Sequence, residues 1–157
     1  MLSPSERQAR KHRLLDLLVQ SEGLMSAPGI TQLEHSLQVA MRAREARAAP
    51  DLVFGALMHD VGRLVSPEAH AKASADLIAP FVSSDTYWIV RVHDEIMLPH
   101  FPDGDGPVSK TDLYENEPWF PRARIFAEDW DRHSFVPHAR TLPLPFFLPM
   151  VDALCNR

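Results

Sequence analysis

His59 and Asp60 stand next to each other at the end of a stretch that is otherwise almost wholly apolar. An imidazole and a carboxylate that enter a hydrophobic core need partners, because burying them unpaired is costly. Coordination of a metal ion is one way to satisfy both side chains. Taken alone, the dipeptide is explained more simply as a solvated pair at the end of a helix.

Four more residues in apolar helical contexts favour the metal-binding interpretation: His35, His70, His93 and Asp131. The helix that carries His35 is joined at Pro50 to the one that leads to His59, so antiparallel packing would bring these two histidines together. Four histidines and two aspartates suffice for two ions, with positions left for water or substrate. We predict one ion held by His35, His59, Asp60 and Asp131, and a second held by Asp60, His70 and His93, so that Asp60 bridges them.

Helices must position these side chains. Capping signals and apolar periodicity predict helices over residues 3–21, 31–48, 50–62, 66 to about 80–84, 85–97 and 118–131, a short helix that begins at 109 or 111, and a last helix from 145. Glycine and proline predict loops at 23–29 and 99–108. The residues after Arg132 read as an irregular, proline-rich tail. No segment shows a strand pattern, so the predicted fold class is all-α, a helical bundle.

Composition excludes several classes of function. The chain has 157 residues, 45% of them hydrophobic and 24% charged, with a net charge of −5. A mildly acidic chain gives no reason to expect nucleic acid or an anionic membrane as a partner. There is no apolar run of the roughly 20 residues that span a bilayer, and no signal-peptide pattern. The single cysteine, Cys155, cannot form an internal disulfide. We therefore expect a cytoplasmic protein.

The order and local sequence of these residues resemble a known superfamily. The pattern His35…His59-Asp60…Asp131, with the strings QLEHSLQVA (32–40) and GALMHDVG (55–62), is similar to the core of the HD-domain superfamily. His70 and His93 resemble the additional ligands of its dinuclear subset. The strings GPVSKTD (106–112), YENEPWF (114–120) and DWD (129–131) resemble a narrower group, the mixed-valent diiron oxygenases that cleave organophosphonates and are relatives of myo-inositol oxygenase.

The resemblance implies one HD domain over residues 1–157, with its core at about 25–140. It also implies two metal ions, Fe(II)/Fe(III) being preferred, although the ligand types also permit Mn, Ni, Co or Zn.

Two positions depart from the pattern of the phosphonate enzymes. Arg63 stands where the group often has a histidine, and Met97 stands where its members carry a lysine. The guanidinium of Arg63 could hold an anionic substrate, or Arg63 could be a solvated cation at a helix end. Ser109 resembles a serine of the oxygenase group, and a plain helix N-cap is its other explanation. Asp60 and Arg63 are the predicted catalytic residues, and Arg63 and Ser109 the predicted substrate-binding residues.

The other histidines are better explained as surface residues; they are His12, His100, His133 and His138. Asp94 and Glu95 either orient neighbouring imidazoles or form a solvated face. Cys155 is expected to pack as a small hydrophobic residue.

Three functions are consistent with the sequence. The first is a diiron oxygenase that uses O₂ to cleave a small hydroxylated, anionic substrate such as an organophosphonate. The second is a metal-dependent phosphohydrolase, in which bound metals activate water and hold a phosphoryl group. The third is a degenerate HD module that binds a ligand without turnover. We favour the oxygenase modestly over the hydrolase.

Overall fold

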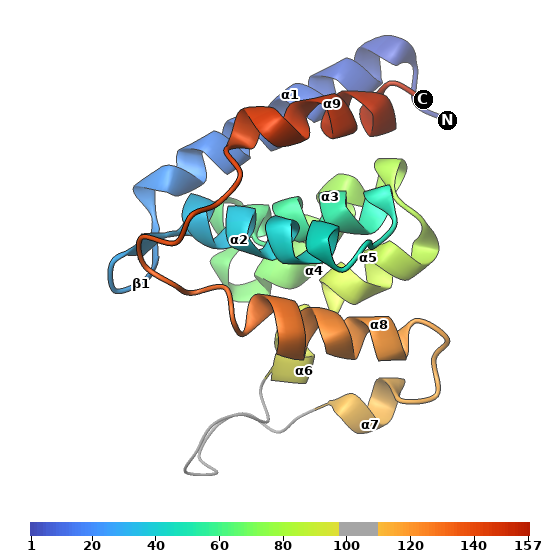
Figure 1. Cartoon of the computed structure of the whole chain (residues 1–157). Helices are drawn as coiled ribbons and strands as arrows, with labels where there is room; N and C mark the ends of the chain where they lie inside the picture. Colours follow the sequence, from blue (N-terminus) through green and yellow to red (C-terminus); the bar gives the residue numbers. More distant parts are fainter. Residues whose placement is uncertain (98–109) are drawn as a thin grey trace.

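Helices make up most of the computed structural model, which describes residues 1–97 and 110–157 (Figure 1). The α-helices are α1 (Pro4–Gln20), α2 (Gln32–Glu45), α3 (Pro50–Met58), α4 (His70–Ile78), α5 (Ser84–Arg91), α6 (His93–Met97), α7 (Thr111–Tyr114), α8 (Phe120–Ile125) and α9 (Leu144–Cys155). Short 3-10 turns are η1 (Ser21–Gly23), η2 (Val61–Leu64), η3 (Pro67–Ala69) and η4 (Ala79–Phe81), and a π-helix, η6 (Phe126–Asp131), follows α8. The predicted all-α fold class is confirmed.

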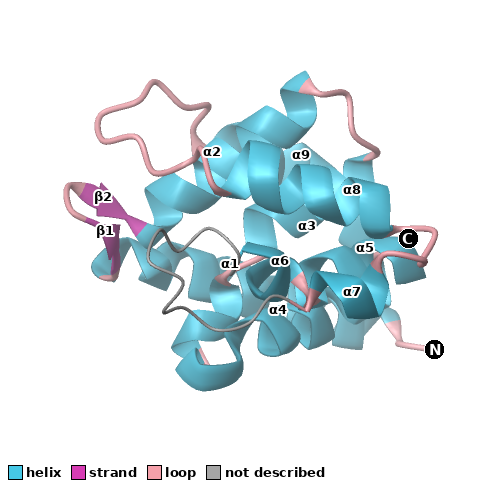
Figure 2. Ribbon diagram, turned by 90° about the horizontal axis from the view of Figure 1, so that it is seen from below, coloured by secondary structure: helices cyan, strands magenta, loops and turns pink. Residues whose placement is uncertain are grey.

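A small antiparallel hairpin lies where the sequence predicts only a loop. Strands β1 (Met25–Ala27) and β2 (Ile30–Thr31) pair across a turn that contains Gly29. Gly29 has a φ of 78°, in the left-handed region that glycine adopts without strain. Strands of two or three residues are too short for alternation of polar and apolar residues to be recognised in the sequence. The hairpin lies at the edge of the helical body in Figure 2.

Side-chain caps fix where several helices begin. Ser3 and Glu6 form a capping box at α1, with each side chain accepting from the other residue's backbone N–H. The Thr31 hydroxyl accepts from the N–H of Glu34 at the start of α2, as the sequence predicts. The helix expected from Ser66 begins instead with the single turn η3, and α4 proper starts at His70.

Helix ends coincide with the predicted ligands. Helix α3 ends at Met58, and Asp60 has left the helical conformation, with φ −117° and ψ 6°. The helix predicted over 85–97 is interrupted at Val92, so His93 begins the separate helix α6. Neighbouring side chains on a continuous helix point about 100° apart. The breaks free these side chains from that constraint and let them point toward one place.

The core surrounds α3. Phe54, Leu57 and Met58 are fully buried there. In Figure 1, α1 and α9 lie side by side as the upper layer, with the two chain ends close together, while α8 lies on the opposite side of α2 and α3. Helix α2 contacts both α3 and η6. Helix α2, the end of α3 and η6, which carry or directly precede predicted ligands, therefore lie close together.

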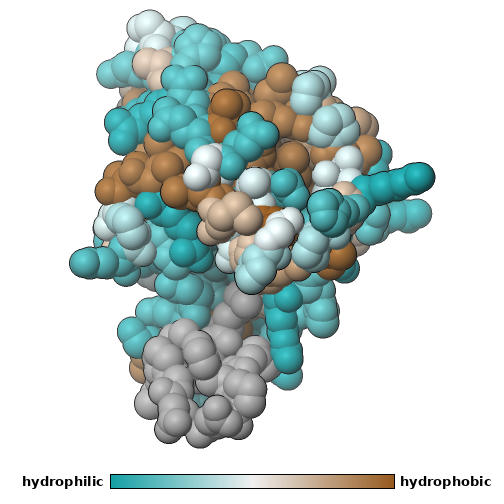
Figure 3. Space-filling model, turned by 90° about the vertical axis from the view of Figure 1, so that its left-hand side faces the viewer, coloured by the Kyte–Doolittle hydropathy of each residue, from teal (hydrophilic) through white to brown (hydrophobic). Residues whose placement is uncertain are grey.

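The surface carries some apolar side chains. Figure 3 shows hydrophobic residues gathered in the upper and middle parts of one face, with hydrophilic residues around them. The end of α1 and β1 lie on this side of Figure 1, and the segment from α1 to β1 exposes Val19, Leu24 and Met25. Within residues 1–97 and 110–157, no helix has the length and apolar character needed to cross a membrane.

Candidate metal centre

The fold brings all six predicted ligands into one buried cluster. They come from five places in the chain: His35 from α2, His59 and Asp60 from the turn after α3, His70 from the start of α4, His93 from the start of α6, and Asp131 from the end of η6. His35, His59, Asp60, His93 and Asp131 are each at most 3% exposed. So many imidazoles and carboxylates inside a core need binding partners, because their burial without partners would be costly.

Asp60 lies at the middle of the cluster, and its two oxygens face different histidines. Oδ2 of Asp60 is 3.1 Å from Nε2 of His59 and 3.6 Å from Nε2 of His35. Oδ1 of Asp60 is 3.3 Å from Nε2 of His93 and 3.4 Å from Nε2 of His70. The cluster is thus two pairs of imidazoles that share one carboxylate.

Asp131 belongs to the His35 and His59 pair. Its Oδ1 atom is 2.8 Å from Nε2 of His35 and 3.4 Å from Nε2 of His59. The π-helix η6 helps to orient it: the N–H of Arg132 donates to the carbonyl of Ala127, five residues back. Widened turns of this kind are common at functional sites because they change the direction of the side chains that follow.

Backbone carbonyls fix the tautomers of three histidines. Nδ1 of His35 lies 2.8 Å from the Ser134 carbonyl oxygen, Nδ1 of His59 lies 2.7 Å from that of Ala56, and Nδ1 of His93 lies 2.6 Å from that of Val90. A carbonyl can only accept, so each Nδ1 must donate. In the neutral form, each Nε2 then presents a lone pair to the cluster. This is the arrangement by which proteins orient histidines for metal binding.

The atoms that face the centre are short of partners. Asp60 Oδ1, Asp131 Oδ1 and His70 Nε2 are buried and form no hydrogen bond within the described structure. Nε2 of His35 and Nε2 of His59 are only 3.2 Å apart, so with both rings neutral and both Nδ1 atoms donating elsewhere their lone pairs would face each other. A cation at this place would satisfy every one of these atoms, so the residues fit a metal site. Two ligand groups with matching spacing are His35, His59 and Asp131, and His59, Asp60 and His93.

The pKa shifts within the cluster also favour the binding of a cation. Burial lowers the pKa of His59, but the carboxylates of Asp60 and Asp131 outweigh this and raise it to about 10. Burial raises the pKa of each carboxyl, but the neighbouring histidines hold both pKa values below the ordinary range. Burial lowers the pKa of His93, but the nearby Asp60 carboxylate outweighs burial and raises it. The carboxylates therefore create a field that attracts positive charge, whether it is a proton or a metal ion.

One side of the cluster is more open than the other. The side chain of His70 is 12% exposed, and burial lowers its pKa despite the charge of Asp60. Arg63, on η2, is 43% exposed, and its Nε atom is 3.5 Å from Asp60 Oδ1. A ligand from solvent would therefore meet Arg63 and His70 first, on the side of Asp60 Oδ1.

The remaining sequence predictions divide into three groups. His12, His133 and His138 are exposed, as expected, and Cys155 is fully buried. Glu95 accepts from Tyr114 and pairs with Lys110, so it does not orient an imidazole by any described contact. Ser109 and His100 lie outside the described residues, as does the loop predicted at 99–108, and the side chain of Met97 is likewise not described.

Gln32, Ser134 and Phe135 are among the residues that contact the cluster and that sequence reasoning missed. Gln32 donates from Nε2 to Asp60 Oδ2 at 2.8 Å. Ser134 accepts from His35, and the ring of Phe135 stacks on the ring of His35 at 4.0 Å between centroids. The position of Gln32, three residues before His35 and so on the same helix face, was a usable signal. Ser134 and Phe135 lie in the proline-rich tail, where no periodicity marks them.

Comparison with known proteins identifies the family. Residues 33–135 match the HD domain, and this match covers most of the chain. The chain therefore belongs to the HD-domain family. No curated protein matches it. Family and geometry together support a metal-dependent enzyme whose buried histidine and aspartate cluster could hold metal ions.

Proposed function

We propose that the protein is a dinuclear metalloenzyme, and that it is an oxygenase that holds Fe(II)/Fe(III) and cleaves a small hydroxylated acid such as an organophosphonate. One observation carries the dinuclear part of this proposal: a single carboxylate, Asp60, turns one oxygen toward each of two imidazole pairs. The ligands of the first ion would be His35, His59, Asp60 and Asp131. The ligands of the second would be Asp60, His70 and His93.

The two positions would differ in charge. The first has two carboxylates and the second has only the shared one, so the first favours the more highly charged ion. The second has three protein ligands and lies on the more open side, which leaves coordination positions for small molecules. A diiron pair, when bound, supplies the electrons and the binding positions for O₂ and for a substrate oxygen.

The protein's own side chains would bind and orient the substrate. Arg63 lies beside the open side of the cluster, and its guanidinium can hold a carboxylate or phosphonate by two parallel hydrogen bonds. This contact would leave the hydroxyl end of the substrate nearest to Asp60 Oδ1 and the second position. The ring of Phe126 lies 5.6 Å from that of His59, and the ring of Phe135 lies 4.0 Å from that of His35, both measured between centroids. These two rings would keep water away from the buried side of the cluster.

A phosphohydrolase is the second candidate, and membership of the HD-domain family favours it. The same ligand set would then activate water, and Arg63 would hold a phosphate ester or nucleotide. Both candidates would use the same buried cluster, and they differ in whether O₂ is consumed.

Metal analysis of protein purified without oxygen tests the proposal. Two irons per chain with a coupled Fe(II)/Fe(III) paramagnetic resonance signal, together with O₂ uptake on 2-hydroxyphosphonates, hydroxycarboxylates or inositols, would support the oxygenase. Mn, Ni, Co or Zn with phosphate release from nucleotides and no O₂ uptake would support the hydrolase instead. Fewer than two ions per chain under saturating metal would overturn the dinuclear proposal itself.

A further inference from the structure

Gln32 is a buried amide that contacts the carboxylate at the centre of the cluster. The residue is 2% exposed, and its Nε2 atom donates to Asp60 Oδ2 at 2.8 Å. Gln32 is the first residue of α2, and its own backbone N–H donates to the Leu24 carbonyl at 2.8 Å. Gln32 is therefore held by two hydrogen bonds, one from its backbone N–H and one from its side-chain amide. It lies just outside the segment that matches the HD domain, which begins at residue 33.

The contact is directional. An amide nitrogen donates and cannot accept, so Gln32 requires an acceptor at Oδ2. It occupies one lone pair of Oδ2 and leaves the other free to face His35 and His59. The other oxygen, Oδ1, has no hydrogen-bond partner and faces His70 and His93. Gln32 thus distinguishes two oxygens that would otherwise be equivalent.

A free aspartate has another way to bind a metal pair. The last torsion of an aspartate side chain is broad, so the carboxylate can rotate. If it rotates, both oxygens can bind the same ion, and the second ion then loses its only carboxylate. A hydrogen bond that fixes Oδ2 on the side of His35 and His59 opposes this rotation.

We propose that Gln32 is a positioning residue that keeps Asp60 in the bridging orientation and so secures the second metal ion. The inference rests on the dinuclear centre proposed above, but on neither of the two candidate reactions. Loss of the Gln32 donor should weaken the second ion more than the first, because the first keeps His35, His59 and Asp131. Removal of such outer contacts commonly lowers metal affinity about 10–100-fold.

Gln32→Met is the test variant, because methionine has a similar length and lacks the donor. Gln38→Met is the matched control. Gln38 lies on the same helix, is 4% exposed, and also donates at 2.8 Å, but to the carbonyl of Val136. The full-length metal-free proteins would be titrated with Mn(II), and stepwise dissociation constants and the paramagnetic resonance spectrum would be recorded. Circular dichroism would establish that each variant is folded.

In the wild type, we expect two Mn(II) ions whose spectrum shows exchange coupling through the shared carboxylate. In Gln32→Met, the second dissociation constant should rise about 10–100-fold while the first changes much less, and coupling should fall even at saturating Mn(II). In Gln38→Met, the affinity for the second ion should not fall, because Gln38 contacts the segment behind His35 and not Asp60, His70 or His93. Equal weakening of both ions, or two coupled ions of unchanged affinity in Gln32→Met, would overturn the role of Gln32 and leave the dinuclear centre standing. A single Mn(II) site in the wild type would overturn both proposals.

Discussion

Gly62 lies against the backbone of His70 with no space for a side chain. A Cβ atom on Gly62 would lie 2.3 Å from the His70 carbonyl oxygen and 2.7 Å from the Ser74 backbone nitrogen. The N–H of Gly62 also donates to the Ser74 hydroxyl at 2.8 Å. This contact presses the start of α4 onto the turn that follows Asp60, and so sets the distance between His70 and Asp60.

Gly62→Ala should therefore separate α4 from this turn. The atoms in the way belong to the backbone and cannot rotate aside, so we expect a loss of about 1–3 kcal/mol in the free energy of unfolding. The affinity for the second metal ion should fall as well, since His70 moves. Denaturant unfolding and metal titration would measure the two effects. Gly23→Ala is the control, because a Cβ atom there would meet nothing within 4 Å; a comparable loss in both variants would contradict this account.

Asp60→Ala should abolish binding of both metal ions. It removes the only ligand that the two proposed sites share and leaves Gln32 and the histidines without their common acceptor. Each buried polar group that loses its partner costs about 1–3 kcal/mol, so the metal-free protein should also be less stable. Metal content and thermal unfolding would be measured beside Asp129→Ala, which removes an exposed carboxylate from η6. Full metal occupancy in Asp60→Ala would refute the bridging assignment.

His70→Ala should remove one ion and spare the other. His70 contacts only the Oδ1 side of Asp60, while Oδ2, His35, His59 and Asp131 keep their mutual positions. Metal analysis should give about half the wild-type content, with any catalytic turnover lost. His133→Ala, an exposed histidine of the tail, should keep both ions. If His70→Ala also keeps both, the second site has been wrongly assigned.

The sequence was sufficient for the fold class and for the grouping of the six ligands, because their residue types and order carry that information. It did not show how the chain turns at them. A helix period treats His93 as part of one helix with Val90, whereas the break at Val92 lets Nδ1 of His93 reach the Val90 carbonyl. Such breaks depend on tertiary contacts, which local propensity does not contain.

The tail after Asp131 shows most clearly what could not be predicted from the sequence. Its prolines predict irregular backbone, and the backbone is irregular, but Phe135 and the carbonyl of Ser134 pack directly on His35. The amide of Gln38 holds this segment by bonding both the N–H and the carbonyl of Val136. Contacts that join residues about a hundred positions apart leave no periodic signal, so sequence reasoning had no means to find them.

Arg63→Gln should raise KM for an anionic substrate, while kcat changes less, if Arg63 holds the anion. A bidentate charge-assisted contact fixes both affinity and orientation, and about 10-fold or more in KM is expected from loss of an interaction worth roughly 1.5–3 kcal/mol. Steady-state kinetics on the substrate identified by screening would measure this. Arg124→Gln, which removes an exposed cation on α8 that pairs with Glu128, is the control. An unchanged KM in Arg63→Gln would make Arg63 a surface cation and would remove the argument for an anionic substrate.

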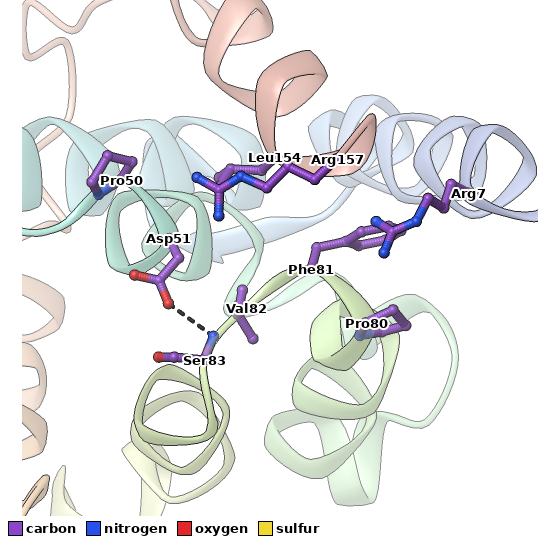
Figure 4. Close-up of a pocket in the computed structure, with 9 residues that line it drawn as sticks. All are labelled: Arg7, Pro50, Asp51, Pro80, Phe81, Val82, Ser83, Leu154 and Arg157. Atoms are coloured by element: carbon purple, nitrogen blue, oxygen red, sulfur yellow. Dashed lines mark hydrogen bonds between the residues drawn. The ribbon is translucent and has the colours of Figure 1, made fainter. Parts of the chain in front are cut away.

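Asp51, which is remote from the metal cluster, should make the free energy of unfolding depend on pH. It lines a cavity of about 490 Å³ with Arg7, Phe81, Ser83 and Arg157 (Figure 4). Its carboxylate accepts from the Ser83 N–H at 2.9 Å, which ties the start of α3 to the start of α5. Burial alone would raise the pKa of Asp51, but the hydrogen bonds from Ser83 outweigh it and hold the pKa below its ordinary value of 3.8.

A lowered pKa in the folded state means that the ionised carboxylate stabilises the fold. This stabilisation is fully present above the ordinary pKa of 3.8 and is lost as the pH falls through the lower value of the folded protein. At pH 7, Asp51→Ala should cost about 1.5–2 kcal/mol, the low end of the range for a hydrogen bond to a charged group, because Asp51 is only half-buried. The difference from wild type should shrink as the pH falls below 3.8. Urea unfolding from pH 7 to pH 2.5, with Asp16→Ala on the exposed side of α1 as the control, would measure it; a difference that is independent of pH would show that the charge of Asp51 contributes nothing.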